Sequence, residues 1–157
     1  MAEIHLMVGF MGFGKTTLAR KLEKELPAVR LTHDEFMRKL FSRNLPEADF
    51  RLAWQKVDDL IWELAAQIVR SGTNVILDYG FWSRDSRRQA FEKASRLTEK
   101  IIFHQVCCDA RVAKQRVLHR SKTDPDELFI DEHCFDNYWA QYEPLDEAEG
   151  YLVVYEK

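Results

Sequence analysis

The sequence predicts an α/β fold built on a mostly parallel sheet. Short apolar runs alternate along the chain with longer stretches whose apolar residues recur at helical spacing, which is typical of strand–helix–strand units. One run, Asn74–Asp78, is apolar throughout its middle, which indicates a strand covered on both faces. Ligands of such sheets collect at the carboxyl ends of the strands, so we expect the functional residues there.

The first strand is expected at Ile4–Val8, a continuous apolar run. A helix follows from residue 15 to about 26, with Leu18 and Leu22 one turn apart. Pro27 ends this helix, because proline cannot continue it.

A second, short strand is expected at Val29–Thr32, and a short helix from residue 34 to about 43. The inward-facing side chains of that helix would be Phe36, Leu40 and Phe41.

A long amphipathic helix is expected over residues 47–70. Pro46 is well placed to start it, and Gly72 is well placed to cap its end. Its apolar stripe recurs at the helical period through Phe50, Trp54, Val57, Ile61, Leu64 and Ile68.

The second half of the chain repeats the alternation. Ser83 would cap a helix that runs to about residue 97, with Phe91 and Ala94 facing inward. Asp109 would cap another helix to about residue 120. The remaining expected elements are strands at 74–78, 101–107 and 151–155, a helix at 131–142 and a polar, mobile stretch at 121–127.

Composition excludes several classes of protein. The 157 residues are 46% hydrophobic and 31% charged, an ordinary balance for a soluble domain, and the net charge of −3 gives no general attraction to nucleic acid. No apolar run approaches the roughly 18 residues of a membrane span, and the start lacks the basic segment of a signal peptide. Cys107, Cys108 and Cys134 form no disulfide framework, so we expect reduced core thiols in a cytoplasmic protein.

The most specific motif is Gly-Phe-Met-Gly-Phe-Gly-Lys-Thr at residues 9–16, which matches G-x-x-x-x-G-K-[ST] at every fixed position. It lies between a strand and a helix, as a phosphate-binding loop must. Gly12 and Gly14 would allow positive φ and a close approach of the backbone to phosphates. Lys15 would reach the β- and γ-oxygens, and Thr16 would place a hydroxyl on Mg²⁺. The residues expected to hold a nucleoside triphosphate are Gly9, Phe10, Met11, Gly12, Phe13, Gly14, Lys15, Thr16 and Thr17.

Asp34 and Arg38 follow the second strand and share one face of a short helix. A hydroxyl that accepts a phosphoryl group needs a carboxylate to orient it and take its proton, which Asp34 would supply. Arg38 would hold the acceptor or the transferring phosphate. The alternative is an exposed salt bridge between the two residues.

Asp78 closes the third strand at the same edge of the sheet. It would orient a Mg²⁺-bound water or hold the acceptor, with capping of the next loop as the alternative. Gly80 allows a sharp turn, and Trp82 would form a wall of the acceptor pocket, although aromatic residues also suit a core. Arg84 would contact an anion near the helix start, the alternative being a solvated face.

Arg116 and Arg120 lie four residues apart, just before the polar stretch. Their shared helix face would close over the phosphates and neutralise charge in the transition state. The alternative is an exposed basic helix that contacts only water.

These features together resemble the P-loop kinases that phosphorylate small molecules and hydroxyl groups. The branch contains polynucleotide 5′-kinase domains, zeta toxins, chloramphenicol phosphotransferase and gluconate kinase. The resemblance is carried by residues 9–16, 31–38, 75–84, 116, 120 and 141–145. It implies a P-loop NTPase three-layer sandwich, in which helices flank a five-stranded parallel sheet of order 2-3-1-4-5. It also implies a single domain over residues 1–157, with acceptor-side helices at about 34–70 and a lid at about 111–130.

The resulting hypothesis is a phosphotransferase that moves the γ-phosphate of ATP to a hydroxyl of a small molecule. Its catalytic residues would be Lys15, Asp34, Arg38, Arg116 and Arg120. The acceptor site would consist of Asp34, Arg38, Asp78, Gly80, Trp82 and Arg84, and Mg²⁺ would lie at Thr16 and Asp78.

Three alternatives remain. A polynucleotide 5′-hydroxyl kinase would need a basic groove, for which the candidates are Arg38, Lys39, Arg43, Arg84, Arg87 and Arg88. The second alternative is a toxin-like kinase of nucleotide sugars, and the third is a non-catalytic ATP-binding switch. No apolar strand ends in Asp-Glu, which disfavours a hydrolysis-driven machine.

Overall fold

The computed structural model describes residues 1–42, 44–125, 127 and 129–156. Its centre is a five-stranded parallel sheet in the order β2-β3-β1-β4-β5. The strands are β1 (Ile4–Val8), β2 (Ala28–Thr32), β3 (Asn74–Asp78), β4 (Ile101–Val106) and β5 (Val153–Glu156). The predicted fold class and strand order are therefore confirmed.

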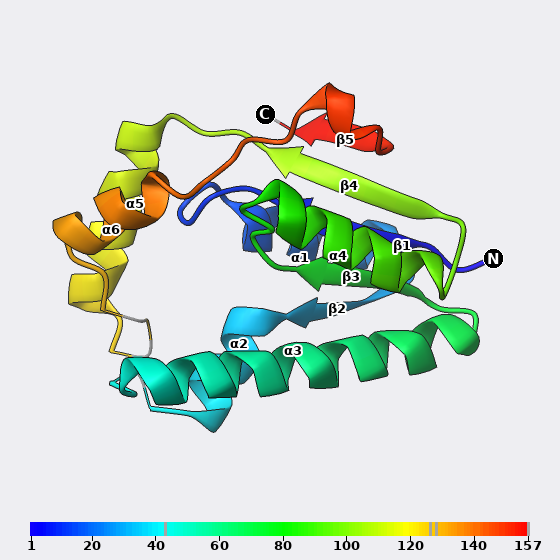
Figure 1. Ribbon diagram of the computed structural model, residues 1–157, viewed down its shortest axis with the longest axis horizontal. Coiled ribbons are helices and arrows are strands. Elements are labelled where there is room, and N and C mark those ends of the chain that lie inside the picture. The colour runs from blue at the N-terminus through cyan, green and yellow to red at the C-terminus, as the bar shows by residue number, and fades with distance from the viewer. Residues whose placement is uncertain (43, 126, 128, 157) are drawn as a thin grey trace.

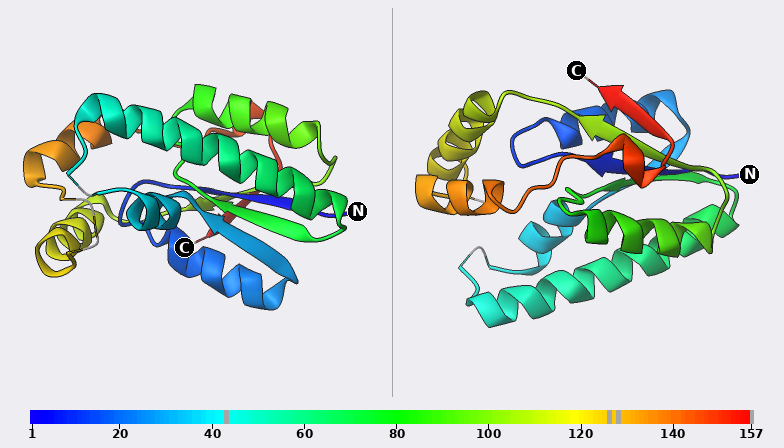
Figure 2. Two further views of the ribbon diagram at one scale, coloured as in Figure 1. Left: turned by 90° about the horizontal axis from the view of Figure 1, so that it is seen from below. Right: turned by 45° about the horizontal axis from the view of Figure 1, so that its top comes forward.

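Helices form the outer layers. The helices are α1 (Lys15–Glu25), α2 (His33–Leu40), α3 (Glu47–Arg70), α4 (Arg84–Ser95), α5 (Ala110–Thr123) and α6 (Glu132–Trp139), with a short 3₁₀ helix at Glu147–Glu149. Figure 1 and Figure 2 show α3 and α4 on one face of the sheet and α1 on the other, with α5 and α6 beyond the carboxyl ends of the strands. Among the described residues, no helix is long and apolar enough to cross a membrane.

The alternation of side chains along β1 explains the two-sided core. Ile4, Leu6 and Val8 are fully buried in the larger cluster, which α3 and α4 cover. Met7 points to the opposite face, where it packs against Ala19 of α1. Because both faces of the central strands are covered, these strands can be apolar throughout, as the sequence indicated.

Helix α2 is shorter than predicted. It ends at Leu40 because Phe41 has an extended backbone, and residue 43 of the predicted helix lies outside the described residues. The expectation that Leu40 faces inward is wrong, since its side chain is 56% exposed. Met37 is buried instead, and Phe41 reaches the core from beyond the helix end.

The second half also differs in detail. Helix α5 continues to Thr123, three residues into the stretch expected to be polar loop, because Ser121 is buried and accepts a hydrogen bond from the backbone of Ile130 (2.9 Å). The predicted core thiols are also wrong. Strand β4 ends at Val106, so Cys107 is exposed, and Cys108 and Cys134 are only half-buried.

Candidate nucleotide and acceptor site

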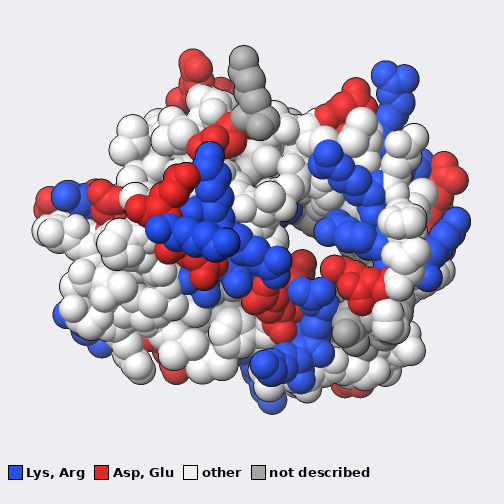
Figure 3. Space-filling view, turned by 180° about the vertical axis from the view of Figure 1, so that it is seen from behind, with Lys and Arg blue, Asp and Glu red and all other residues white. Residues whose placement is uncertain are grey.

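An open cavity of about 1630 Å³ lies at the carboxyl ends of the strands. Its walls come from the loop before α1, from α2, α3 and α5, and from the loop between β3 and α4. Figure 3 shows the hollow from behind, with Lys and Arg side chains gathered around its mouth and Asp and Glu side chains beside them. The cavity is therefore where a parallel sheet places its ligands.

The phosphate-binding loop fits an anion at the start of α1. Gly14 precedes the helix with φ of 94°, and the first turn contains no acidic residue and no capping side chain. The free backbone N–H groups and the helix dipole therefore face the cavity. Lys15 is half-buried, and its Nζ donates a hydrogen bond to the carbonyl of Phe10 (2.8 Å).

Not all of the loop faces the cavity. Residues 11–17 line it, whereas Gly9 and Phe10 do not. Phe10 is fully buried, and its ring packs against Trp82 and Phe135 at centroid distances of 4.8 and 5.1 Å. The Phe10 side chain therefore anchors the loop to the neighbouring segments, and its backbone carbonyl accepts the hydrogen bond from Lys15.

Gly12 is the most constrained position of the loop. Its φ is +79°, and an added Cβ would lie 2.6 Å from the carbonyl oxygen of Ala113 in α5. We expect Gly12→Ala to lower the free energy of unfolding by more than the roughly 1–3 kcal/mol of backbone strain alone, and to weaken ATP binding. Thermal unfolding and calorimetric titration would measure the two effects.

Gly150→Ala is the matched control, because Gly150 has φ of +80° with nothing near the added Cβ. It reports the cost of backbone strain without a clash. Equal losses of stability in the two variants would contradict the close packing of the loop against α5.

A buried carboxylate joins the loop to the sheet edge. Asp78 is 4% exposed and accepts hydrogen bonds from the hydroxyls of Thr16 (2.7 Å) and Thr32 (2.9 Å) through one oxygen, Oδ2. Burial raises the pKa of Asp78, and the two hydroxyls and the charge of Lys15 oppose this shift. The hydroxyl and carboxylate oxygens form a donor set that suits Mg²⁺.

Three charged side chains lie close enough to Lys15 to shift its pKa. Burial lowers the pKa of Lys15; the charges of Asp78 and Asp34 raise it, and that of Arg120 lowers it further. The structure thus brings Asp34 on α2 and Arg120 on α5 close to Lys15.

Asp34 and Arg38 do not pair with each other. Asp34 is exposed and lines the cavity, and none of the described residues donates a hydrogen bond to its carboxylate. Arg38 also lines the cavity, but its Nη1 pairs with Oε1 of Glu127 at 3.1 Å. The alternative interpretation, a surface salt bridge between these two residues, is therefore wrong, and Asp34 is open to a ligand.

The basic face of α5 lies over the phosphate-binding loop. Arg116 and Arg120 both line the cavity, and Nη1 of Arg116 donates a hydrogen bond to the carbonyl of Gly12 (3.2 Å). Buried Ala113 and Val117, on the same helix, pack in a cluster with Phe13 of the loop. This packing holds the two arginines at the cavity.

Only some of the predicted residues in and after the loop that follows β3 line the cavity. Asp78, Gly80 and Trp82 line the cavity. An added Cβ on Gly80 would lie 2.2 Å from Nε1 of Trp82, so only glycine leaves room for this indole. Arg84 does not line the cavity; it pairs with Asp146 at 2.9 Å beside a separate small hollow. Its predicted place in the acceptor site is therefore not supported by the geometry.

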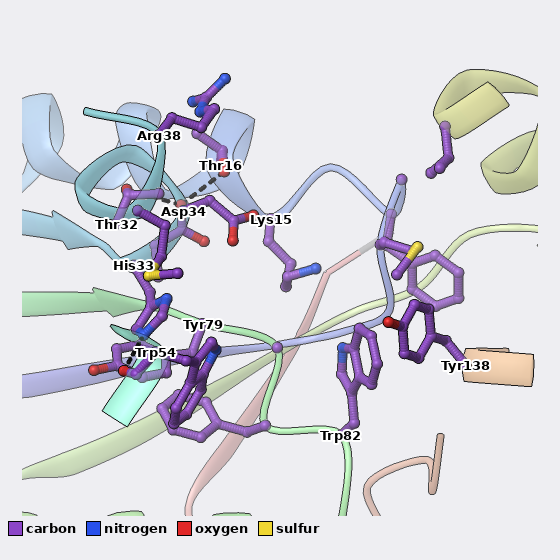
Figure 4. A pocket seen from close by; sticks show the side chains of 18 of the residues that line it. Lys15, Thr16, Thr32, His33, Asp34, Arg38, Trp54, Tyr79, Trp82 and Tyr138 are labelled. Carbon is purple, nitrogen blue, oxygen red and sulfur yellow. Dashed lines mark hydrogen bonds between the residues drawn. The ribbon is translucent and has the colours of Figure 1, made fainter. Parts of the chain in front are cut away.

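Apart from Trp82, sequence reasoning missed the aromatic side chains that line the cavity. Figure 4 shows Lys15 between two sets of rings: His33, Trp54 and Tyr79 on one side, and Trp82 and Tyr138 on the other. Trp54 belonged to the predicted core stripe of α3, yet it is 38% exposed and lines the cavity. Helical periodicity marks the face of a helix but does not distinguish a packed core from a cavity wall.

It also missed the role of Arg87. This arginine is fully buried and forms a two-pronged ion pair with Glu149 (2.8 and 3.0 Å). It also donates to the carbonyls of Phe81 (2.7 Å) and Glu143 (2.9 Å). Phe81 has φ of 46°, an unusual value for a residue with a side chain, and Arg87 fixes its carbonyl. The network therefore positions the loop that bears Trp82.

The comparisons agree with this architecture. The model of a family described as an AAA domain matches residues 4–145. No curated protein matches the sequence. In this chain, Asp78 at the end of β3 is followed by Tyr79 and not by a second acidic residue.

Solved structures share the fold. A Chloroflexus aurantiacus protein provisionally named as a kinase has a TM-score of 0.79 and 16% identity, over 98% of this chain and 86% of that one. Kti12 from Chaetomium thermophilum, in complex with ADP-AlF3, has a TM-score of 0.75 and 17% identity, over 98% and 88%. A gluconokinase from Sinorhizobium meliloti has a TM-score of 0.63 and 19% identity, over 98% and 81%. At these identities the likeness establishes the fold alone, which is P-loop kinase-like.

Proposed function

Because the chain belongs to this AAA domain family and has the P-loop kinase-like fold, we propose that it is an ATP-dependent phosphotransferase that acts on a hydroxyl of a small molecule. The observation that carries the proposal is Asp34, an exposed carboxylate in the cavity, near Lys15 and without a hydrogen-bond donor among the described residues. A carboxylate in this position can take the proton of a hydroxyl that attacks a phosphate near Lys15. A cytoplasmic location and a preference for ATP over GTP belong to the same proposal.

In the proposed reaction, Asp34 accepts a hydrogen bond from the acceptor hydroxyl and takes its proton. The acceptor oxygen forms a bond to the γ-phosphorus while the bond to the bridging oxygen breaks, which leaves ADP. Lys15, Arg116 and Arg120 stabilise the charge on the phosphoryl oxygens. Mg²⁺, held by Thr16 with Asp78 near its waters, would neutralise part of the phosphate charge.

We further propose that residues 1–157 act as one unit. Helices α2 and α3, within residues 34–70, form the acceptor side, and the segment of about 111–130 serves as the lid. The contact of Arg38 with Glu127 joins these two parts, which supports this division. A closed lid would exclude water and so limit hydrolysis of ATP.

The polynucleotide alternative has less support from the geometry. Arg84 pairs with Asp146, Arg87 with Glu149, and Arg88 with both Asp85 and Glu92. Arg38 is also paired, and Arg43 lies outside the described residues. The candidate groove therefore offers few cations free to bind a phosphate backbone.

Transfer of labelled γ-phosphate from ATP tests the proposal. Pools of sugars, nucleosides, antibiotics, nucleotide sugars and 5′-hydroxyl oligonucleotides would be offered with and without Mg²⁺. We expect a labelled product only with Mg²⁺, and a loss of transfer on the order of a hundredfold or more in Lys15→Ala. Lys24→Ala, at an exposed position of the same helix, is the control and should keep full activity. ATP binding without a labelled product from any pool would favour the switch.

A further inference from the structure

We propose that the acceptor is an uncharged alcohol that carries an aromatic ring. This inference rests on the proposed function and names the class of molecule that the acceptor end of the cavity would take. Its observations are the ring chamber, defined as His33, Trp54, Tyr79 and Phe81, and the ion pairs of Arg38 and Lys93, two cations that line the cavity.

The ring chamber is built from three elements that meet at the cavity wall. The ring of His33 lies 4.4 Å from that of Trp54 and 5.1 Å from that of Tyr79, between centroids. Tyr79 and Phe81 stack at 4.9 Å with an angle of 12° between their planes. His33, Tyr79 and Phe81 are themselves buried and hold one another in place, so they form a rigid wall beside Trp54, which carries the exposed ring surface.

Trp54 is the surface that such a ligand would cover. Its indole is 38% exposed although it lines the cavity and contacts His33. The Nε2 of His33 donates a hydrogen bond to the backbone carbonyl of Trp54 (3.1 Å), which fixes the imidazole beneath the indole. Because this apolar face is exposed to solvent inside a cavity, an aromatic ring stacked against it would stabilise a bound ligand.

The polar groups around the chamber are already satisfied within the protein. The hydroxyl of Tyr79 donates to Asp58 (2.8 Å), and Lys93 pairs with the same carboxylate (3.3 Å). Lys93 also lies over the ring of Trp62, 5.5 Å from its centroid. Burial lowers the pKa of His33, so its ring is neutral at pH 7.

Among the described residues, the cations that line the cavity from α2, α3 and α4 are Arg38 and Lys93. Each of them is already paired with a carboxylate. Asp34, beside the chamber, adds a negative charge that repels an anionic acceptor. A nucleotide sugar or polynucleotide would bring its own phosphates against this carboxylate, whereas an uncharged ring would not.

Binding of matched probes separates this inference from the proposed function. The nucleotide site would be filled with a non-hydrolysable ATP analogue and Mg²⁺, and acceptors would be titrated by calorimetry. The probes are thymidine and phenylethanol, their analogues without the aromatic ring, deoxyribose and ethanol, and thymidine 3′-phosphate. We expect each aromatic alcohol to bind at least tenfold more tightly than its non-aromatic analogue, and thymidine to bind at least tenfold more tightly than its 3′-phosphate.

Variants locate the binding. Trp54→Ala should weaken binding of thymidine about tenfold, in line with the loss of one stacking surface, and Trp54→Phe should restore most of it. Phe91→Ala, which removes a half-exposed ring of α4 outside the cavity, should leave binding unchanged. Circular dichroism would establish that each variant is folded.

The outcomes are distinct. Aromatic alcohols that bind no better than their analogues, equal binding of thymidine 3′-phosphate, or an unchanged affinity in Trp54→Ala would each overturn the inference, even if the protein transfers phosphate to other alcohols. Ring-dependent binding that Trp54→Ala weakens, without phosphate transfer, would uphold the ring chamber and count against the proposed reaction instead.

Discussion

Asp34→Asn should lose phosphate transfer while it keeps ATP binding. The amide has the size of the carboxylate but cannot take the proton of the acceptor hydroxyl, so we expect the rate of transfer to fall by about 10²–10⁴-fold. Asp34 is exposed and receives no hydrogen bond from a described residue, so the fold should be unaffected. Labelled transfer and calorimetric ATP titration on the same preparation would measure the two properties.

Asp49→Asn is the control for the loss of a negative charge. Asp49 is exposed in the first turn of α3 and does not line the cavity, so this variant should transfer phosphate normally. Transfer at the wild-type rate in Asp34→Asn would remove the proposed base. A parallel loss of ATP affinity would instead mean that Asp34 acts on the nucleotide site through Lys15.

Arg87→Ala should cause the largest loss of stability. Its side chain is fully buried and that of Glu149 is 8% exposed, so removal of the guanidinium leaves a buried carboxylate without its partner. Breaking such a pair costs about 3–5 kcal/mol. For a chain of this length that corresponds to a fall in Tm of roughly 6–20 °C, measurable by thermal unfolding.

Arg88→Ala provides the matched control on the next residue. Arg88 is exposed, and its pairs with Asp85 and Glu92 lie in solvent, so little change in Tm is expected. Arg87→Lys should fall between the two, because an ammonium keeps the charge but cannot reproduce the fork that reaches Glu149 and two carbonyls. A Tm for Arg87→Ala close to that of Arg88→Ala would contradict a structural role for the network.

The pH dependence of this network follows from Glu149. Burial raises the pKa of this carboxyl, but the hydrogen bonds from Arg87 and from the backbone of Asp146 outweigh burial and lower it below its ordinary value of 4.5. The stabilisation is therefore complete above pH 4.5 and is lost as the pH falls further. The difference in Tm between wild type and Arg87→Ala should accordingly narrow in acid.

Much of the fold followed from local patterns in the sequence. The bounds of Ile4–Val8, Glu47–Arg70 and Asn74–Asp78 agree with the sequence expectation, because each pattern is long or strongly apolar and has clear end signals. The predicted bounds were wrong where an element ends in polar residues. Helix α5 continues through Ser121 because the side-chain oxygen of Ser121 accepts a hydrogen bond from the backbone N–H of Ile130, a contact that no local pattern reveals.

The residues of the site also separate into those that the sequence predicts and those that only the tertiary structure reveals. The loop of residues 9–16 is contiguous, so its spacing alone predicts it, and Asp34 and Asp78 follow from their places at strand ends. Arg84 and Arg87 are three residues apart on one helix, yet one pairs at the surface and the other is fully buried. Their partners lie about sixty positions away, at Asp146 and Glu149, so only the tertiary structure distinguishes the two arginines.

The most direct test of the central claim is phosphorus NMR of the wild-type protein with ATP, Mg²⁺ and an acceptor pool. The account predicts that the γ-phosphate signal of ATP is replaced by ADP and by a new phosphate monoester signal, and that the monoester is absent in Asp34→Asn. Release of inorganic phosphate without a monoester would contradict phosphate transfer and identify the protein as an ATPase. ATP that stays intact with every acceptor would leave nucleotide binding as the activity of this fold.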